Sequence, residues 1–425
     1  MLFLREQGSR HHRHEGDDSE TPSKTQPCTP SQLSRAYGLT VRVDSFGVKT
    51  CSRASAGHGE CIERYRYTRH HTAVRIAQVS PLFESVPPRL YGGTERVVAF
   101  LTDELVRLGH EVTLFASGDS ETQARLIPVW PNALRLDASC RDPLAPHVLM
   151  LEEVAQRAHE FDVIHFHISQ FHLPVVRRLS VAHVTTMHGR LDMPELAPLF
   201  AEFHDVPLVS ISDAQREPLP EAGWIETIHH GLPVDLLGFD PGPGKYLAFL
   251  GRIAREKRVD RAIAIATALG QRLRIAAKID PADRDYFEHE IRPLLDHPLV
   301  EFIGEINEQE KGAFLGQATA LLFPIDWPEP FGLVMIEALA CGVPVVAFRG
   351  GSVPEVIDDG VTGFIVDSVE DAIVATQNVH RLDRYRCRAV FERRFNATRM
   401  AQNHVALYEQ LLERRSSGHA LTGVG

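Results

Sequence analysis

The sequence predicts an α/β protein built from two doubly wound domains that face each other across a cleft. Three observations lead to this prediction: short apolar runs alternate with helical runs, the alternation restarts near residue 233, and a Pro/Gly-rich stretch separates the two series. Such alternation indicates parallel sheets covered by helices on both faces. Ligands of these folds bind at the carboxyl ends of the strands, so the cleft is the expected binding site.

The first series is expected to form a domain over residues 73–232. It opens with a strand at 75–80 and a helix at 94–109, whose apolar side chains recur on one face and whose stop signal is Gly109. Further strands are predicted at 110–118, 161–167, 183–189 and 207–212.

The second series is expected to form a domain over residues 233–395, beginning in a Pro/Gly-rich linker. Residues 396–425 are expected to hold a tail and a helix that packs back across both domains. The strands of this series are predicted at 246–253, 273–279, 299–306, 320–324, 343–348 and 363–367.

Residues 1–72 are rich in Arg, His, Ser, Thr and Gly without a sustained period, which predicts a disordered extension. Within it, His11, His12 and His14 are interpreted as part of a solvated basic tail rather than as a metal site. One hypothesis is that translation starts near Val74, where the ordered pattern begins. An intact-mass measurement on the native protein tests this hypothesis. A mass that requires residues before Val74 would contradict it.

The amino-acid composition excludes several classes of protein. With 425 residues, 44% hydrophobic and 24% charged, the chain has the make-up of a globular protein of two or three domains. The net charge of −11 argues against a nucleic-acid-binding protein. The six cysteines form no CxxC pair, which argues against a zinc site and favours a reducing, cytoplasmic compartment. No apolar run suits a membrane span or a signal peptide, so any membrane contact is expected to be peripheral, at the inner face.

Two basic residues follow the first strand of the second series. In FLGRIAREKRVD, residues 249–260, Arg252 and Lys257 leave the carboxyl end of this strand. A guanidinium and an ammonium five residues apart can hold a diphosphate from two directions. A solvated charged turn would give the same run, so this motif alone leaves both interpretations open.

A pair of glycines precedes the first helix. Gly92 and Gly93, in LYGGTERVV, would let a ligand approach the N–H groups at the helix N-terminus, whose partial positive charge attracts anions. A plain tight turn explains the pair equally well. The GxGxxG fingerprint is missing from the first strand–helix junction, which argues against an NAD-dependent oxidoreductase.

Two glutamates flank a Pro-Phe-Gly turn in DWPEPFGLVMIEALACG, residues 326–342. Pro330 suits the first position of a helix, so a first turn with free N–H groups is predicted there. This turn would consist of Phe331, Gly332, Leu333 and Val334. Phosphates can bind at such a helix end, while Glu329 and Glu337 accept hydrogen bonds from sugar hydroxyls on either side. A dipole-stabilising first glutamate and a salt-bridged second one would fit the same spacing.

Together and in this order, the motifs resemble those of the family 4 retaining glycosyltransferases. Glu329 and Glu337 match the E-x7-E signature of that family. The resemblance covers about residues 75–412 and implies the GT-B fold, in which two Rossmann-like domains face each other. The other matching segments are Gly251-Arg252 with Glu256-Lys257, HHGLPVD at 229–235 and GGSVPEVI at 350–357.

The resemblance implies a role for each site residue. Glu337 would bind the ribose hydroxyls of a nucleotide sugar, and Glu329 would contact hydroxyls of the donor sugar. Arg252 and Lys257 would hold the diphosphate, and His188 would face the reacting sugar. Of these, the catalytic residues would be His188, Glu329, Arg252 and Lys257. The remaining donor contacts would come from Gly92, Gly93, Phe331, Gly332, Leu333 and Val334.

Three neighbouring features are given no such role. His165 and His167 edge the predicted cleft, but neither is assigned a direct part. Arg258 departs from the pattern, because the family often has glycine there. The sequence DRD at 283–285 fits the DxD pattern of metal-dependent transferases, but we expect an exposed helical segment without a metal.

The implied reaction moves a sugar from a UDP-, GDP- or ADP-sugar to an acceptor hydroxyl with retention of configuration, and needs neither a metal nor another cofactor. The acceptor would be a sugar, a lipid-linked sugar or a small molecule. Two alternatives stay open: a sugar-nucleotide epimerase of the same fold, and a non-catalytic module that binds nucleotide sugars.

Overall fold

The computed structural model describes residues 39–43, 49–53, 73–89 and 92–417. The chain divides into two compact units, Met1–Thr72 and Ala73–Gly425. In the first unit, β1 (Leu39–Val43) and β2 (Lys49–Arg53) pair antiparallel. The predicted disorder of residues 1–72 and the interpretation of the histidine tail fall mainly outside the described residues. These stay predictions, as do the domain boundaries.

The N-terminal lobe is built on a seven-stranded parallel sheet in the order β5-β4-β3-β6-β7-β8-β9. Its strands are β3 (Arg75–Val79), β4 (Glu111–Ser117), β5 (Arg125–Trp130), β6 (Val163–Phe166), β7 (Ala182–Thr186), β8 (Leu208–Ser210) and β9 (Trp224–Thr227). Its helices are α2 (Gly93–Arg107), α3 (Leu144–Arg157), α4 (Leu173–Val176) and α5 (Leu196–Glu202). All of β6 and all of β3 except Arg75 are buried, as expected of central strands covered on both faces.

The C-terminal lobe is built on a six-stranded parallel sheet in the order β12-β11-β10-β13-β14-β15. Its strands are β10 (Tyr246–Arg252), β11 (Leu273–Lys278), β12 (Val300–Gly304), β13 (Ala318–Phe323), β14 (Val345–Phe348) and β15 (Gly363–Val366). Its helices are α6 (Val259–Leu269), α7 (Arg284–Tyr286), α8 (Glu308–Gly316), α9 (Leu333–Ala340), α10 (Val353–Val356), α11 (Val369–Asn378) and α12 (Arg384–Arg394).

The predicted fold class is confirmed, because the chain forms two parallel sheets one after the other and each sheet is packed against helices. Each predicted strand contains an observed one, or overlaps it. The helix predicted at 94–109 is α2, and Gly109 follows its end with a φ of +91°, a conformation that glycine adopts without strain. Within the seven-stranded sheet, the pattern missed β5 and β9, which are its two edge strands.

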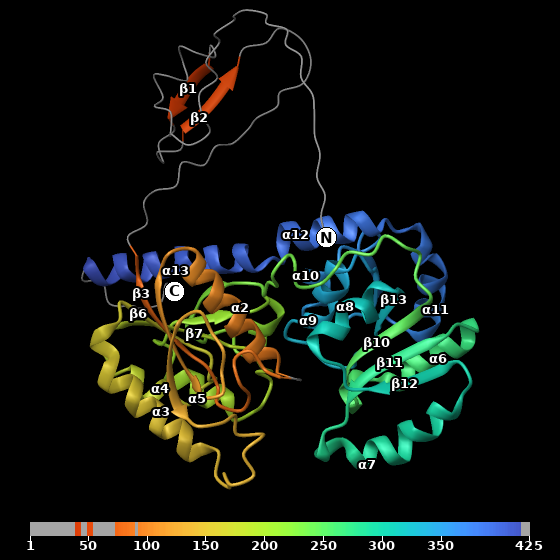
Figure 1. The fold of residues 1–425 in the computed structure, drawn as a ribbon, viewed down its shortest axis with the longest axis horizontal. Helices are drawn as coiled ribbons and strands as arrows, with labels where there is room; N and C mark the ends of the chain where they lie inside the picture. Colours follow the sequence, from red (N-terminus) through yellow and green to blue (C-terminus); the bar gives the residue numbers. More distant parts are fainter. Residues whose placement is uncertain (1–38, 44–48, 54–72, 90–91, 418–425) are drawn as a thin grey trace, which may run out of the picture. The chain divides into compact units, whose positions relative to one another are not determined.

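The last helix, α13 (Ala397–Ser416), returns to the N-terminal lobe. Figure 1 shows α12 and α13 in succession along one side of both lobes, in blue. Buried side chains of α13, among them Met400, Val405 and Tyr408, share an apolar cluster with Val97 of α2 and Val184 of β7. Within the described parts of the chain, no helix has both the length and the apolar character needed to cross a bilayer.

Candidate active site

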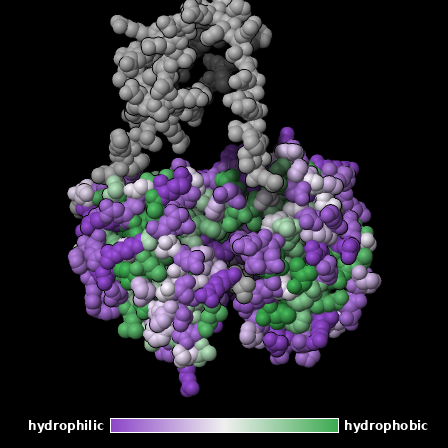
Figure 2. Space-filling model, viewed as in Figure 1, coloured by the Kyte–Doolittle hydropathy of each residue, from purple (hydrophilic) through white to green (hydrophobic). Residues whose placement is uncertain are grey.

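The predicted site residues line one cavity between the two lobes. It has a volume of about 520 Å³ and lies where the carboxyl ends of both sheets meet. Figure 2 shows the hollow between the two lobes from one side. His167 also reaches the cavity, whereas His165 lies fully buried behind it. The predicted residues that line the cavity are Gly92, Gly93, His188, Arg252, Lys257, Glu329, Phe331, Gly332, Leu333, Val334 and Glu337.

The start of α9 differs from the prediction. The helix begins at Leu333, directly after Gly332, whose φ is +73°. The predicted start at Pro330 is wrong, because the left-handed conformation of Gly332 interrupts the helical turn. Phe331 and Gly332 therefore precede the helix, and its free first-turn N–H groups begin at Leu333.

Two serine hydroxyls hold the loop in front of α9. Ser212, from the N-terminal lobe, donates to the carbonyl of Pro330 at 2.7 Å, and Ser352 donates to the carbonyl of Phe331 at 2.9 Å. With these carbonyls engaged, the polar groups that the loop offers to an anion are backbone N–H groups. Sequence reasoning did not single out either serine, although Ser352 lies inside the GGSVPEVI motif.

Arg252 is surrounded by carboxylates at the end of β10. Its guanidinium lies 2.8 Å from Glu256, 3.3 Å from Asp280 and 3.5 Å from Asp283. Asp283, the first residue of the DRD sequence, thus contacts Arg252, the residue predicted to bind the diphosphate. These partners hold the guanidinium at the cavity wall.

Lys257 bridges two residues of the loop before α9. Its ammonium forms an ion pair with Glu329 and lies 4.7 Å from the ring centre of Trp327. The indole N–H of Trp327 donates to the same carboxylate at 3.0 Å. The predicted phosphate-binding cation and the predicted sugar-binding carboxylate are therefore in direct contact.

Glu337 lies within a group of four charges. Its Oε1 is 2.6 Å from Arg96 and 3.1 Å from Lys311, and Glu308 contacts the same two cations at 2.8 and 3.3 Å. Burial opposes the charge of Glu337, but Lys311 and Arg96 outweigh burial and lower its pKa to about 2. Arg96 belongs to α2, so this group joins the two lobes.

Sequence reasoning missed Arg96 and Lys311 as partners of the E-x7-E signature. Arg96 lies three residues after Gly93 in GGTER, and this closeness to the glycine loop is the signal that could have found it. Lys311, on α8, lies in no motif.

The glycine loop brings the start of α2 close to the start of α9. A Cβ at Gly92 would lie 2.7 Å from the Cβ of Pro88, and a Cβ at Gly93 would lie 3.7 Å from Cδ1 of Leu333. Two helix N-termini therefore converge on the cavity, each with partial positive charge. Glu95, in the first turn of α2, also lines the cavity, and burial raises its pKa to about 7.

His188 reaches the cavity from the end of β7. Its Nε2 lies 2.9 Å from Nδ1 of His167, and its ring stacks on His230 with centroids 5.2 Å apart. Burial lowers the pKa of His188 to about 3, so the ring is neutral near pH 7. A neutral ring can exchange a hydrogen bond with a sugar hydroxyl but adds no charge to the site.

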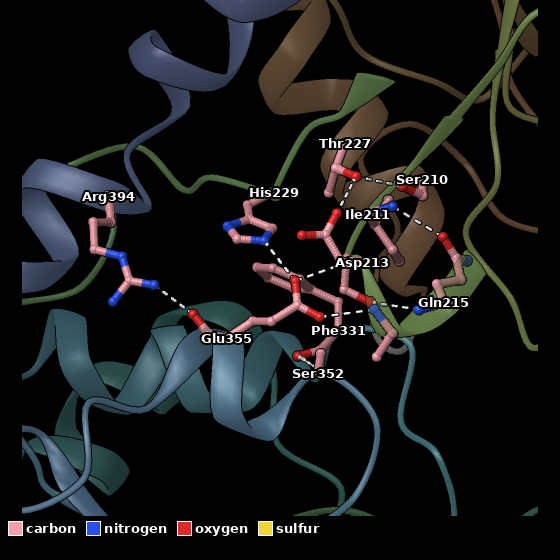
Figure 3. A network of polar contacts seen from close by, with 12 residues as sticks. Ser210, Ile211, Asp213, Gln215, Thr227, His229, Phe331, Ser352, Glu355 and Arg394 are labelled. Carbon is pink, nitrogen blue, oxygen red and sulfur yellow. Dashed lines mark hydrogen bonds and ion pairs between the residues drawn. The ribbon is translucent and has the colours of Figure 1, made fainter. Parts of the chain in front are cut away.

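Glu355, on α10, ties the C-terminal lobe to a turn of the N-terminal lobe (Figure 3). Its carboxylate accepts hydrogen bonds from the N–H groups of Asp213 and Ala214, both at 2.8 Å, and lies 3.1 Å from Nε2 of His229. Arg394 donates to the backbone carbonyl of Glu355. Burial raises the pKa of Glu355, but the bonds from His229 and the two N–H groups outweigh burial and lower it.

Glu355→Gln is expected to lower the free energy of unfolding by about 1–3 kcal/mol, because the amide nitrogen that replaces one carboxylate oxygen cannot accept a hydrogen bond. The folded-state pKa lies below the ordinary 4.5, so this contribution is present above pH 4.5 and is lost at lower pH. Denaturant titrations at pH 7 and pH 4 measure both effects. Glu392→Gln, which changes an exposed partner of Arg388, should shift the free energy by less than about 1 kcal/mol. Equal effects of the two variants would contradict the role of Glu355.

Two family models match this chain. The model described as Glycosyltransferase Family 4 matches residues 91–284, and the model described as Glycosyl transferases group 1 matches residues 239–382. The first match covers most of the N-terminal lobe and the second most of the C-terminal lobe. Together they run without a gap from residue 91 to residue 382.

Similar proteins extend over the same range. Glycogen synthase of Mycobacterium tuberculosis is 26% identical over 386 residues, which covers 75% of this chain and 92% of that protein. An uncharacterized protein of the cps region of Klebsiella pneumoniae is 33% identical over 128 residues, but this match covers 28% of this chain and 35% of that protein.

Among solved structures, AviGT4, a glycosyltransferase involved in avilamycin A biosynthesis, superposes with a TM-score of 0.63 at 25% identity, covering 80% of this chain and 98% of its own. Anabaena HepE in complex with UDP-glucose has the same fold, with a TM-score of 0.61 at 17% identity over 79% of this chain and 100% of its own.

Proposed function

The chain belongs to the family 4 glycosyltransferases of the GT-B fold. We propose that it transfers a sugar from a nucleotide-sugar donor to an acceptor hydroxyl, with retention of the anomeric configuration. One observation carries the proposal: the cations Arg252 and Lys257, the carboxylates Glu329 and Glu337, and the N-termini of α2 and α9 line the same cavity. The cations and helix ends suit a diphosphate, and the carboxylates suit the hydroxyls on either side of it.

Donor binding exchanges partners that are already in contact. A diphosphate beside Lys257 would replace Glu329 as the partner of the ammonium. Glu329 would then be free to accept hydrogen bonds from the transferred sugar. Glu337, held ionised by Arg96 and Lys311, would accept hydrogen bonds from the ribose. The donor would thus give a new partner to Lys257 and to Glu329, the two groups that its binding separates.

The same groups would stabilise the transition state. Negative charge grows on the diphosphate as the bond to the sugar breaks, and Arg252, Lys257 and the N–H groups at the start of α9 would face that charge. These groups supply the positive charge that the departing diphosphate needs, so the proposed reaction runs without a metal. Front-face attack by the acceptor, with its proton passing to the departing phosphate oxygen, would retain the configuration.

The class of donor also has support from outside the chain. The structure of HepE with UDP-glucose shows that a protein of this fold holds a nucleotide sugar. We propose a UDP-, GDP- or ADP-sugar as the donor, and a sugar, a lipid-linked sugar or a small molecule as the acceptor. If the acceptor is a lipid-linked sugar, the proposal also includes peripheral contact with the inner face of a membrane.

A thermal-shift screen with UDP-, GDP- and ADP-sugars tests the donor site. One nucleotide class is expected to raise the unfolding temperature, because a ligand at about 100 times its Kd stabilises the folded state by about 2.7 kcal/mol. Release of the nucleotide diphosphate is then expected only when an acceptor is added. Conversion of the donor without an acceptor would instead identify an epimerase, and binding without turnover would identify a non-catalytic module.

A further inference from the structure

A continuous row of hydrogen-bonded side chains runs from the cavity into the core of the N-terminal lobe. Its members lie on or directly after the neighbouring strands β3, β6 and β7, and on α13. In order, the bonds join His188 Nε2 to His167 Nδ1 at 2.9 Å, His167 Nε2 to Gln78 Oε1 at 2.7 Å, Gln78 Nε2 to Tyr408 Oη at 3.2 Å, Tyr408 Oη to His165 Nδ1 at 2.7 Å, and His165 Nε2 to Thr186 Oγ1 at 2.7 Å.

The bonds between Gln78 and the cavity have a common direction. A neutral imidazole has one N–H and one bare nitrogen, and an amide has one donor end and one acceptor end. Burial lowers the pKa of both His167 and His188, so both rings are neutral. Each ring therefore donates at one nitrogen and accepts at the other. If one bond of this segment is reversed, all the others must reverse with it.

The amide of Gln78 sets that direction. Its oxygen faces His167 and its N–H group faces Tyr408. His167 must donate to this oxygen from Nε2, which leaves its Nδ1 bare, and His188 must donate to that nitrogen from its own Nε2. Nδ1 of His188 then has no proton, and it is buried without a hydrogen-bond partner among the residues that the structure describes.

We propose that Gln78, His167 and Tyr408 are positioning residues that hold His188 as its Nε2–H tautomer, so that the bare Nδ1 accepts a hydrogen bond from a sugar hydroxyl in the cavity. A group that faces a bare imidazole nitrogen has to bring the proton. A hydroxyl has one, whereas an ionised phosphate oxygen does not. This wall of the cavity therefore selects the sugar over the diphosphate. The sugar as the ligand rests on the proposed function, but the tautomer does not.

Nitrogen NMR of the whole chain labelled with ¹⁵N-histidine measures the tautomer directly, and the spectrum of His188→Gln identifies the resonances. In the ligand-free chain at pH 7, we expect Nε2 of His188 to be protonated and Nδ1 to be bare. Addition of UDP-glucose, GDP-mannose or ADP-glucose, whichever raises the unfolding temperature, should shift the Nδ1 resonance while Nε2 stays protonated. A protonated Nδ1 in the ligand-free chain would overturn the proposal.

Two substitutions test the positioning role. Tyr408→Phe removes the hydroxyl that accepts the hydrogen bond from the Gln78 amide, which leaves this amide free to turn over. His188 should then become a mixture of tautomers, and kcat/KM should fall roughly tenfold, the effect of one lost hydrogen bond. Gln78→Met cuts the row nearer the cavity and should affect both readouts at least as much. Tyr246→Phe is the matched control, because that buried hydroxyl donates to the carbonyl of Phe314 at 2.7 Å in the other lobe. It should leave the tautomer unchanged and the rate within about twofold.

The outcomes separate the two proposals. A single tautomer and wild-type rates in folded Tyr408→Phe and Gln78→Met would refute the positioning role. If neither variant folds, the wild-type spectrum still decides whether Nδ1 is bare. A wild-type chain that has the expected tautomer but transfers no sugar would refute the proposed function and leave the tautomer standing.

Discussion

Glu337→Gln is expected to weaken nucleotide-sugar binding by at least about 100-fold, the effect of two hydrogen bonds to a charged acceptor. It should also lower the free energy of unfolding by roughly 3 kcal/mol. The physical reason is that Arg96 and Lys311 lose the carboxylate that both contact, and Arg96 is itself buried. Isothermal titration calorimetry with the donor and denaturant titration measure the two effects.

Glu308→Gln provides the matched control. Glu308 contacts the same two cations, but its side chain is 35% exposed and does not line the cavity. We expect a stability change of less than about 1 kcal/mol and donor binding within about threefold of the wild type. Equal losses of donor binding in both variants would show that the charge of the group matters rather than the position of Glu337.

The effect of Glu337 on stability has a defined pH dependence. Its pKa is about 2 in the folded chain against an ordinary value of 4.5, so unfolding takes up a proton between these values. The contribution is therefore fully present above pH 4.5 and is lost as the pH falls toward 2. The gap in unfolding free energy between wild type and Glu337→Gln should narrow steadily below pH 4.5.

Lys257→Ala is expected to lower kcat/KM by roughly 100- to 1,000-fold, the range seen when one fixed electrostatic contact to a transition state is removed. Most of the loss should lie in kcat, because charge on the diphosphate grows as the bond to the sugar breaks. Glu329 keeps its bond from the Trp327 indole at 3.0 Å, so the loop before α9 should remain in place. Steady-state kinetics with the donor identified by thermal shift measures the change.

Arg255→Ala is the control for the loss of a nearby positive charge. Arg255 lies two residues from Lys257, is paired with Glu290 and does not line the cavity, and its side chain is 67% exposed. Its removal should change kcat/KM by less than about twofold. If Lys257→Ala raised KM and left kcat unchanged, the lysine would be a ground-state ligand and its proposed catalytic role would be wrong.

That Arg252, Lys257, Glu329 and Glu337 line one cavity could be predicted because the signals for these residues are local. Arg252 and Lys257 leave the end of one strand, and Glu329 and Glu337 flank one turn, so short stretches of sequence bring these groups together. Arg96 lies next to the glycine loop in the sequence, but its contact with Glu337 depends on how the two lobes meet. No local pattern encodes that meeting, and the same holds for Ser212 on the loop before α9.

Two strands and one helix boundary show other limits of pattern. β5 contains Pro128 and has one buried residue, and β9 has none, so neither gives the continuous apolar run of a central strand. They form nevertheless, because each adds hydrogen bonds to the edge of an existing sheet. At α9 the pattern favoured Pro330 as the first residue, but the positive φ of Gly332 delays the helix to Leu333.

The return of α13 sets an order of events during synthesis. The strands of the N-terminal lobe leave the ribosome first, but Met400, Val405 and Leu411, which cover part of its apolar surface, are made near the end of the chain. Until then Ile76 and Leu105 lack these neighbours. The first lobe to emerge is therefore the last to be completed, and a nascent chain without its final helix exposes apolar surface that favours aggregation. The N-terminal lobe is thus completed only after the whole C-terminal lobe has been synthesised, because α13 follows that lobe in the chain.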